Sequence, residues 1–355
     1  MLKSLERRWK KLWIGLLTGL MRSPKARPDW GSRPHKLLFL RHDRLGDMIV
    51  STHVMRVIAE SHPGMTLDVL ASPANAAGVE GAPYVRKIIK FDRRDPAGYL
   101  RTAAALRAEG YDAVIDCMVT APSVTTLLLM LASNAPYRVG ISGRGNDAAI
   151  NVRVPPAGGI QYMAVELGAL AAAFGVDPKS VDWRPELYIP PQKLEEAAAR
   201  WRSTGKPHGQ RVLINVSAGT AIRQWQVEKY AAVIAHIRKR WPEASVLITG
   251  APDDQLRVSE VAELSGSMPA ATPKLVDVFA LVATADFVFT PDTSIAHAAS
   301  AFGPLTVVMH RATEPARWGL YPGVGEDIEH DEPTLLTLEV PRVIDAIDRV
   351  LARRG

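Results

Sequence analysis

The sequence predicts an α/β protein made of two successive open α/β domains, each built on a parallel sheet. Apolar runs of strand length alternate with helical patterns from Lys36 onward, and this alternation restarts near Arg211 after a polar stretch. The chain has 355 residues, which is more than one hydrophobic core usually supports. We therefore expect ligands beyond the carboxyl ends of the strands, with the main site in a cleft between the domains.

The first series of elements begins with the short apolar run KLLFLR, which is typical of a buried strand. Helical patterns separate the runs that follow, which favours parallel βαβ units. The predicted order is a strand at 36–41, a helix from Gly46 to about Ser61, strands at 65–71 and 86–91, a helix at about 97–109, a strand at 111–117, Gly-rich loops near 140–146 and an Ala-rich helix near 162–175.

The second series follows Pro190-Pro191 and a helical pattern around Glu195. Its predicted elements are strands at 211–216, 245–249, near 271, at 286–290 and at 304–309, with helices at 226–240, 253–265, 275–284, 293–302 and 338–353. We expect a helix and linker over 1–35, domains over 36–190 and 191–335, and a terminal helix over 336–355.

Composition excludes several classes of protein. Hydrophobic residues make up 47% and charged residues 23%, unlike a disordered, collagen-like or multi-span membrane protein. The single cysteine, Cys117, excludes an internal disulfide framework and a zinc site built on cysteines, and it fits a reducing compartment. The phosphate loop, the Gly-x-Gly-x-x-Gly fingerprint after the first strands, and His-Glu-x-x-His are all absent from the sequence. We therefore do not expect a common ATPase, a dinucleotide-dependent dehydrogenase or a zinc protease.

The net charge of +6 is unevenly distributed. The first 36 residues contain ten Lys and Arg against two acidic residues, and the remaining 33 basic and 35 acidic residues leave the body slightly negative. A body without net positive charge is a poor match for a phosphate-backbone footprint. We expect no nucleic-acid partner.

The N-terminal segment 1–22 predicts a basic amphipathic helix. Its apolar residues recur at spacings of three and four, and Arg7, Arg8, Lys10 and Lys11 occupy the other face. Such a helix suits the surface of an anionic membrane leaflet, and the uncharged run 12–21 is too short to span a bilayer. We interpret it as peripheral attachment to the cytoplasmic face of the inner membrane. The alternatives are a helix packed on the protein or on a second subunit, and a cleaved signal peptide.

The first motif whose residue types suit catalysis or binding, at residues 40–47, follows the first predicted strand. Gly46 permits a tight turn, and Asp47 would lie near a helix N-terminus, which favours the ionised carboxylate that accepts a proton. In the alternative interpretation Asp47 is a helix N-cap, and Arg41, Asp43 and Arg44 form a solvated ion-pair group.

The second motif, at residues 215–225, joins a strand to a loop of small residues. Ser217, Gly219 and Thr220 offer hydroxyls and free amides, and Arg223 adds a cation. Such a loop can cradle phosphate oxygens, although strand-to-turn segments of this kind are common. Gly250, with Asp253 and Asp254 after it, is a lesser candidate at the next strand end.

The third motif, at residues 290–297, lies where another strand gives way to a helix. Thr293 and Ser294, which follow Asp292, offer hydroxyls and N-terminal amides to an anion, and His297 lies about one turn further on. The alternative is a capped helix with a buried structural histidine. Residues 314–319 form a further lesser candidate.

The three motifs, in this order, resemble glycosyltransferase family 9, the lipopolysaccharide heptosyltransferases. The resemblance covers about residues 36–350. It rests on Arg41-x4-Gly46-Asp47-x4-Thr52, on Ser217-Ala218-Gly219-Thr220 with Arg223-Gln224-Trp225, on Asp292-Thr293-Ser294-x-x-His297, and on Thr313 to Gly319.

This resemblance implies the GT-B fold, with two facing Rossmann-like domains and an interdomain cleft. It implies inverting transfer of heptose from ADP-heptose to a lipopolysaccharide core or lipid A acceptor, without metal or cofactor. The acceptor would bind the N-terminal domain, with Asp47 as general base and Asp43 in reserve. Arg223 would balance the diphosphate charge, and Thr293, Ser294 and His297 would bind the phosphates.

The sequence departs from the family pattern in two places that bear on the donor. Ser294 stands where the family has glycine, and Arg223 stands where lysine is frequent. Three alternatives stay open: transfer from another nucleotide sugar, a non-catalytic member that binds a nucleotide sugar or glycolipid, and a sugar-nucleotide epimerase.

Overall fold

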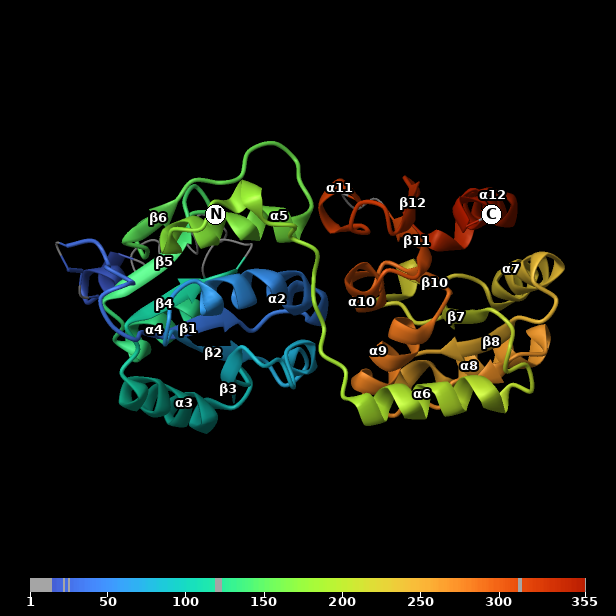
Figure 1. Cartoon of the computed structure of the whole chain (residues 1–355), viewed down its shortest axis with the longest axis horizontal. Coiled ribbons are helices and arrows are strands. Elements are labelled where there is room, and N and C mark those ends of the chain that lie inside the picture. Colours follow the sequence, from blue (N-terminus) through green and yellow to red (C-terminus); the bar gives the residue numbers. More distant parts are fainter. Residues whose placement is uncertain (1–14, 22, 25, 119–122, 312–314, 355) are drawn as a thin grey trace, which may run out of the picture. The chain divides into compact units, whose positions relative to one another are not determined.

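The computed structural model describes residues 15–21, 23–24, 26–118, 123–311 and 315–354. The chain divides into two compact units, the first ending at Trp183 and the second beginning at Arg184. Each unit contains one six-stranded parallel sheet with helices along it (Figure 1). The prediction of two parallel α/β domains is confirmed.

The sheet of the first unit has the strand order β3-β2-β1-β4-β5-β6. Its strands are β1 (Lys36–Arg41), β2 (Thr66–Ala71), β3 (Val85–Lys90), β4 (Ala113–Asp116), β5 (Tyr137–Ile141) and β6 (Val152–Val154). Leu40 of β1 lies opposite Leu70 on one side and Asp116 on the other. The central strands are buried on both faces, as expected of a parallel sheet covered by helices.

Helices pack against both faces of this sheet. They are α2 (Leu45–Glu60), α3 (Pro96–Glu109), α4 (Val124–Ser133), α5 (Met163–Gly168) and the 3-10 helices Ala76–Gly78, Ala169–Phe174 and Pro178–Ser180. Leu38 and Leu40 of β1 share a core with Leu106 of α3 and Leu127 of α4. Because side chains alternate along a strand, Leu37 and Phe39 face the opposite side.

The sheet of the second unit has the order β12-β11-β10-β7-β8-β9. Its strands are β7 (Arg211–Asn215), β8 (Ser245–Thr249), β9 (Met268–Pro269), β10 (Phe287–Pro291), β11 (Leu305–Arg311) and β12 (Gly325–His330). Its helices are α6 (Pro191–Ser203), α7 (Val227–Arg240), α8 (Gln255–Ser265), α9 (Leu275–Thr284), α10 (Ser294–Phe302), α11 (Pro315–Trp318) and α12 (Val340–Leu351), with 3-10 turns at Ala221–Arg223, Pro252–Asp254, Leu335–Thr337 and Ala352–Arg354.

The predicted strands and helices of both units are found within a few residues of their expected bounds, but five strands and α-helices were missed. These are α4, β5, β6, α11 and β12. The loop expected from about residue 140 is wrong in part, because Gly140 pairs with Asp116 inside β5. A Cβ on Gly140 would lie 2.8 Å from Ile150, so this glycine permits close packing rather than a loop. The helix expected at 162–175 is α5 followed by a 3-10 helix.

The N-terminal amphipathic helix lies mostly outside the described residues. Residues 15–19 are helical, which agrees with its final turn. Leu17 is buried in the core of the first unit, whereas Leu16 and Leu20 are 56% and 64% exposed. This end of the segment therefore packs on the body and also presents apolar side chains to solvent. No helix within the described ranges is long and apolar enough to cross a membrane.

Trp225 joins the loop of the second motif to the core of the second unit. Its fully buried indole donates a 2.8 Å hydrogen bond to the Leu338 carbonyl and lies edge-on to Tyr230 and Phe289. We expect Trp225→Phe to lower the free energy of unfolding by about 1–3 kcal/mol, because it leaves a cavity and removes the hydrogen bond. Urea unfolding followed by circular dichroism measures this loss.

The matched control is Trp241→Phe, since Trp241 is only partly buried and packs on Phe287 alone among aromatic rings of the described chain. The control should cost less than the Trp225 variant. Equal losses would show that the Trp225 indole has no special structural role.

Candidate functional site

Each sheet has a switch point, where consecutive connections leave in opposite directions. In the first unit the chain passes from β1 to β2 and β3, then returns to β4 on the other side of β1. In the second unit it passes from β7 to β8 and β9, then returns to β10 beside β7. Open parallel sheets bind ligands beyond the carboxyl ends of such strand pairs. The three predicted motifs follow β1, β7 and β10, so they lie at these two points.

Arg41 ends β1 and is fully buried. Its Nε donates a 2.9 Å hydrogen bond to the Asp47 carbonyl, and its guanidinium also donates to the carbonyl of Cys117. The same guanidinium lies 3.3 Å from a carboxylate oxygen of Asp43 and 3.3 Å from one of Asp47. A buried cation requires such partners, so Arg41 holds both carboxylates at the end of the strand.

Asp47 lies in the first turn of α2, and the N-cap is Arg44. The alternative in which Asp47 is the N-cap is therefore wrong, and so is the turn expected at Gly46, which lies inside the helix. The position still favours a carboxylate, because the amide dipoles of a helix point their positive end there. The Asp47 side chain is 14% exposed, so a ligand can reach it.

Asp43 is in a different electrostatic state. Burial raises the pKa of its carboxyl group to about 6, although the Arg41 charge opposes this rise and the neighbouring Asp47 adds to it. Its Oδ1 atom is buried without a hydrogen-bond partner among the described residues. Burial also lowers the pKa of His42 to about 4, so this imidazole is neutral at physiological pH. Burial therefore favours the neutral form of both Asp43 and His42.

Sequence reasoning missed Asp116, which ends β4 on the other side of the switch point. It is 3% exposed, accepts hydrogen bonds from Asn146 at 3.0 Å and from the Met118 amide at 3.1 Å, and has a pKa raised by burial. Its signal was present as an acidic residue near the end of the predicted strand 111–117. Thr52, by contrast, is buried about two turns inside α2 and donates to the Ile49 carbonyl, which is a structural role.

In the second unit, Asn215 connects the second and third motifs. It ends β7, and its amide nitrogen donates to the hydroxyls of Thr290 at 2.9 Å and Thr293 at 3.3 Å. Thr293 is the N-cap of α10 and accepts from the Ile295 amide, which confirms the capped helix. Ser294 begins that helix, and His297 is buried at 5% exposure.

Arg223 forms an ion pair with Asp292, in which the nearest nitrogen and oxygen are 3.0 Å apart. Both side chains remain partly exposed, at 25% and 13%. The same Oδ2 atom of Asp292 lies 4.0 Å from Nδ1 of His310, whose second ring nitrogen is 2.7 Å from Asp327. The predicted cation thus lies at the same strand ends as the third motif.

Of the remaining candidate binding residues, some are packed in the interior and others are exposed to solvent. Ser217 is buried and accepts a 2.5 Å hydrogen bond from the Ala251 amide, and a Cβ on Gly250 would lie 2.9 Å from its hydroxyl oxygen. Gly250 is therefore needed for close approach of two loops. Gly219 and Thr220 are exposed beside Arg223. No group of three or more His, Cys, Asp or Glu in the described chain is placed to hold a metal ion.

Two parallel α/β units, each with charged residues at its switch point, define a fold class that the solved structures identify as GT-B. A family 9 glycosyltransferase from Veillonella parvula matches with a TM-score of 0.77 at 17% identity, over 90% of this chain and 97% of that one. The Escherichia coli heptosyltransferase WaaC with ADP-2-deoxy-2-fluoro heptose matches with a TM-score of 0.70 at 17% identity, over 90% of this chain and 100% of that one.

The family model described as "Glycosyltransferase family 9 (heptosyltransferase)" matches residues 99–332. A candidate glycosyltransferase from Haemophilus influenzae is 22% identical over 342 residues, covering 89% of this chain and 95% of its own. The chain belongs to glycosyltransferase family 9, as its motifs predicted.

The buried ion-pair group around Arg41 makes a prediction about stability. We expect Arg41→Met to lower the free energy of unfolding by about 3–5 kcal/mol, because it leaves two carboxylates beside an apolar side chain. Arg44→Met is the control, since Arg44 directly follows Asp43 but is exposed, and surface changes usually cost under about 0.5 kcal/mol. Chemical denaturation of both variants measures the difference, and equal small losses would contradict the interpretation.

The raised pKa of Asp43 makes a second prediction. The folded state holds this proton more tightly than the unfolded state, so the stabilisation is complete below about pH 4 and is lost as the pH rises through about 6. The free energy of unfolding of the wild type should therefore fall between pH 4 and 7 relative to Asp43→Asn, which does not titrate. Parallel pH profiles for the two proteins would show that Asp43 has an ordinary pKa.

Proposed function

We propose that the protein is an inverting glycosyltransferase that moves heptose from ADP-heptose onto a lipopolysaccharide core or related surface-glycan acceptor. The observation that carries the proposal is the carboxylate of Asp47, held by a fully buried arginine at the switch point of the first unit. Family membership supports the reaction class, and the donor and acceptor are the finer parts of the proposal.

In the proposed reaction, an acceptor hydroxyl oxygen attacks the anomeric carbon of the donor sugar. The bond from that carbon to the diphosphate breaks, ADP departs with the electron pair, and the hydroxyl proton passes to a carboxylate of the protein. Asp47 is the proposed base, because its partly exposed carboxylate lies in the first turn of α2. Arg41 is a positioning residue, since it is fully buried and acts through the carboxylates it holds.

Asp43 is the second candidate for the base, and one observation favours it. A general base works best when its pKa lies near the working pH, and the pKa of Asp43 is raised to about 6. In the leading assignment Asp43 instead binds the acceptor near Asp47. Both residues share Arg41, so their titrations are linked.

We assign the donor to the second unit. Arg223, which follows the exposed loop residues 219–222, and the N-terminus of α10 together offer positive potential to a diphosphate. Ser294 and Thr293 place hydroxyls at the same helix end. The complex of WaaC with an ADP-heptose analogue supports this choice of donor.

We further propose that the protein works on the cytoplasmic face of the inner membrane, attached through residues 1–22. The net charge of +8 over the first 36 residues and the exposed leucines Leu16 and Leu20 support this placement. Attachment would confine the enzyme to the surface where a lipid-linked acceptor is embedded.

The decisive variant is Asp47→Asn, which keeps the shape of the side chain and removes the base. We expect the turnover of ADP-heptose in the presence of acceptor to fall by about 10²–10⁴-fold, while donor binding changes little. Release of ADP measures turnover, and thermal stabilisation by the donor measures binding. Asp331→Asn, at an exposed position of the second unit, is the control for the loss of one carboxylate and should keep full activity.

Four outcomes would revise the assignment. Full activity of Asp47→Asn with a large loss in Asp43→Asn would transfer the role of base to Asp43. Stabilisation by another nucleotide sugar and not by ADP-heptose would change the donor. Donor turnover without acceptor would indicate an epimerase, and donor binding without turnover in any acceptor panel would indicate a non-catalytic binding protein.

A further inference from the structure

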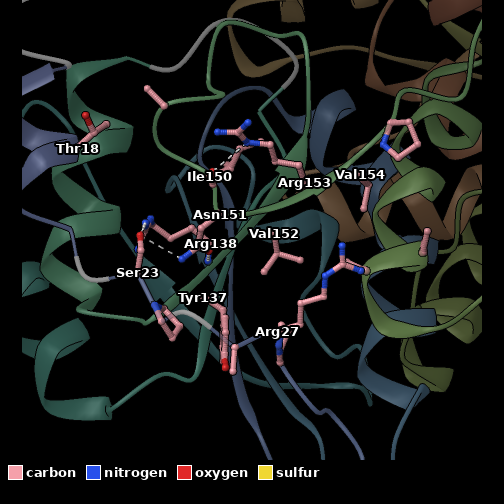
Figure 2. A pocket seen from close by; sticks show the side chains of 17 residues that line it. Thr18, Ser23, Arg27, Tyr137, Arg138, Ile150, Asn151, Val152, Arg153 and Val154 are labelled. Atoms are coloured by element: carbon pink, nitrogen blue, oxygen red, sulfur yellow. Dashed lines mark hydrogen bonds between the residues drawn. The ribbon is translucent and has the colours of Figure 1, made fainter.

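A concave site lies in the first unit, away from the residues around Asp47. It has a volume of about 770 Å³ and runs along β6 and the start of β5, beside Thr18 and residues 23–24 and 26–28 (Figure 2). In the sheet, β4 and β5 lie between β6 and β1. The pocket therefore does not include the carboxyl end of β1, where the candidate catalytic carboxylates lie, and none of the proposed steps uses it.

The charged side chains that line this pocket are all positive. Its described lining residues include Arg27, Arg138 and Arg153, and no aspartate or glutamate. The three arginines come from three segments: the chain before β1, strand β5 and strand β6 (Figure 2). Arginine clusters of this kind bind phosphate groups well, because the planar guanidinium donates two parallel hydrogen bonds.

Arg138 is built into the wall and is 3% exposed. Its Nε donates a 2.6 Å hydrogen bond to the Ala149 carbonyl, and a terminal nitrogen donates a 2.8 Å hydrogen bond to the Ser23 hydroxyl. Asn151 also reaches Ser23, at 3.5 Å (Figure 2). Burial lowers the pKa of Arg138, which shows that its charge is held at a cost that a nearby anion would offset.

Apolar surface adjoins the arginines. Ile150, Val152 and Val154 line the pocket together with Ala172 and Ala173. Thr18, on the short helical turn that also carries the exposed Leu16 and Leu20, completes the rim. A ligand that carries a phosphate beside a hydrocarbon portion matches this combination better than a free inorganic anion does.

We propose that this pocket binds the phosphate headgroup of an anionic phospholipid and so docks the first unit on a membrane surface. The inference rests on the proposed membrane attachment and gives it a defined binding site beyond residues 1–14. Arg27 and Arg153 contact the headgroup phosphate, Arg138 supplies buried positive potential, and Leu16 and Leu20 enter the acyl boundary.

The test compares two double variants of the full chain with the same change of charge. Arg27→Gln with Arg153→Gln removes the exposed arginines of the pocket, and Arg202→Gln with Arg240→Gln removes two exposed arginines of the second unit. Binding is measured by sedimentation with vesicles of phosphatidylcholine alone and with one third phosphatidylglycerol. We expect the pocket variant to lose at least about tenfold in binding to the anionic vesicles, and the control to lose less than about threefold.

Equal losses in both variants would overturn the proposal, because they would show attraction by net charge alone. Unchanged vesicle binding by the pocket variant would also overturn the proposal. If the affinity of that variant for soluble glycerol 3-phosphate falls at the same time, the pocket binds a soluble phosphate and not a lipid headgroup. Thermal unfolding of both variants confirms that they are folded.

A chain that lacks residues 1–14 separates this inference from the proposed attachment. If the deletion abolishes vesicle binding while the pocket variant binds normally, the N-terminal segment is the anchor and the proposal that the pocket binds lipid is refuted. A tenfold loss in the pocket variant with full binding by the deletion would support the pocket and refute the anchor role of residues 1–14. Transfer activity toward a soluble acceptor should be unchanged in the pocket variant.

Discussion

The charge of Arg41 is the constraint around which the first unit is organised. A guanidinium that is fully buried at the end of a central strand has to be surrounded by acceptors, and the chain supplies them from the loop after β1, from α2 and from the residue after β4. The same requirement keeps Asp43 and Asp47 together at a position where solvent still reaches them. Burial of the Asp43 carboxyl group is the main cause of its raised pKa, and the second acid beside the same cation, Asp47, adds to that rise.

The second unit fixes the strand ends at its switch point with neutral groups. At its switch point the amide of Asn215 bonds to two threonine hydroxyls, so the strand ends are fixed without burying a charge. The charged pair Arg223 and Asp292 lies outward of this neutral layer. The negative potential of one unit and the exposed cation and helix N-terminus of the other suit the two parts that we propose for them, proton acceptance and diphosphate binding.

Much of the fold follows from local pattern, and the failures have physical causes. Runs such as residues 36–41 and 245–249 are apolar and bounded by turns, so their prediction was accurate. The edge strands β6 and β12 carry Arg153 and several acidic residues, and such half-exposed strands lack an apolar signature. Asp43 and Asp47 were found from spacing, whereas Asp116 depends on the non-local pairing of β4 with β1. The pocket beside β6 joins residues over 100 positions apart, which no local pattern reveals.

The ion pair between Arg223 and Asp292 has a consequence for the order of events on the enzyme. A cation that already has an internal counterion attracts a single phosphate weakly, because the incoming anion must also face the carboxylate of Asp292. A diphosphate that the proposed site also holds at the N-terminus of α10 can overcome that repulsion. Once the sugar has left and the negative charge of the diphosphate has grown, the same carboxylate repels it more strongly. Asp292 would therefore compete with the diphosphate for Arg223. Formation of the Arg223–Asp292 ion pair again would speed the release of the nucleoside diphosphate product.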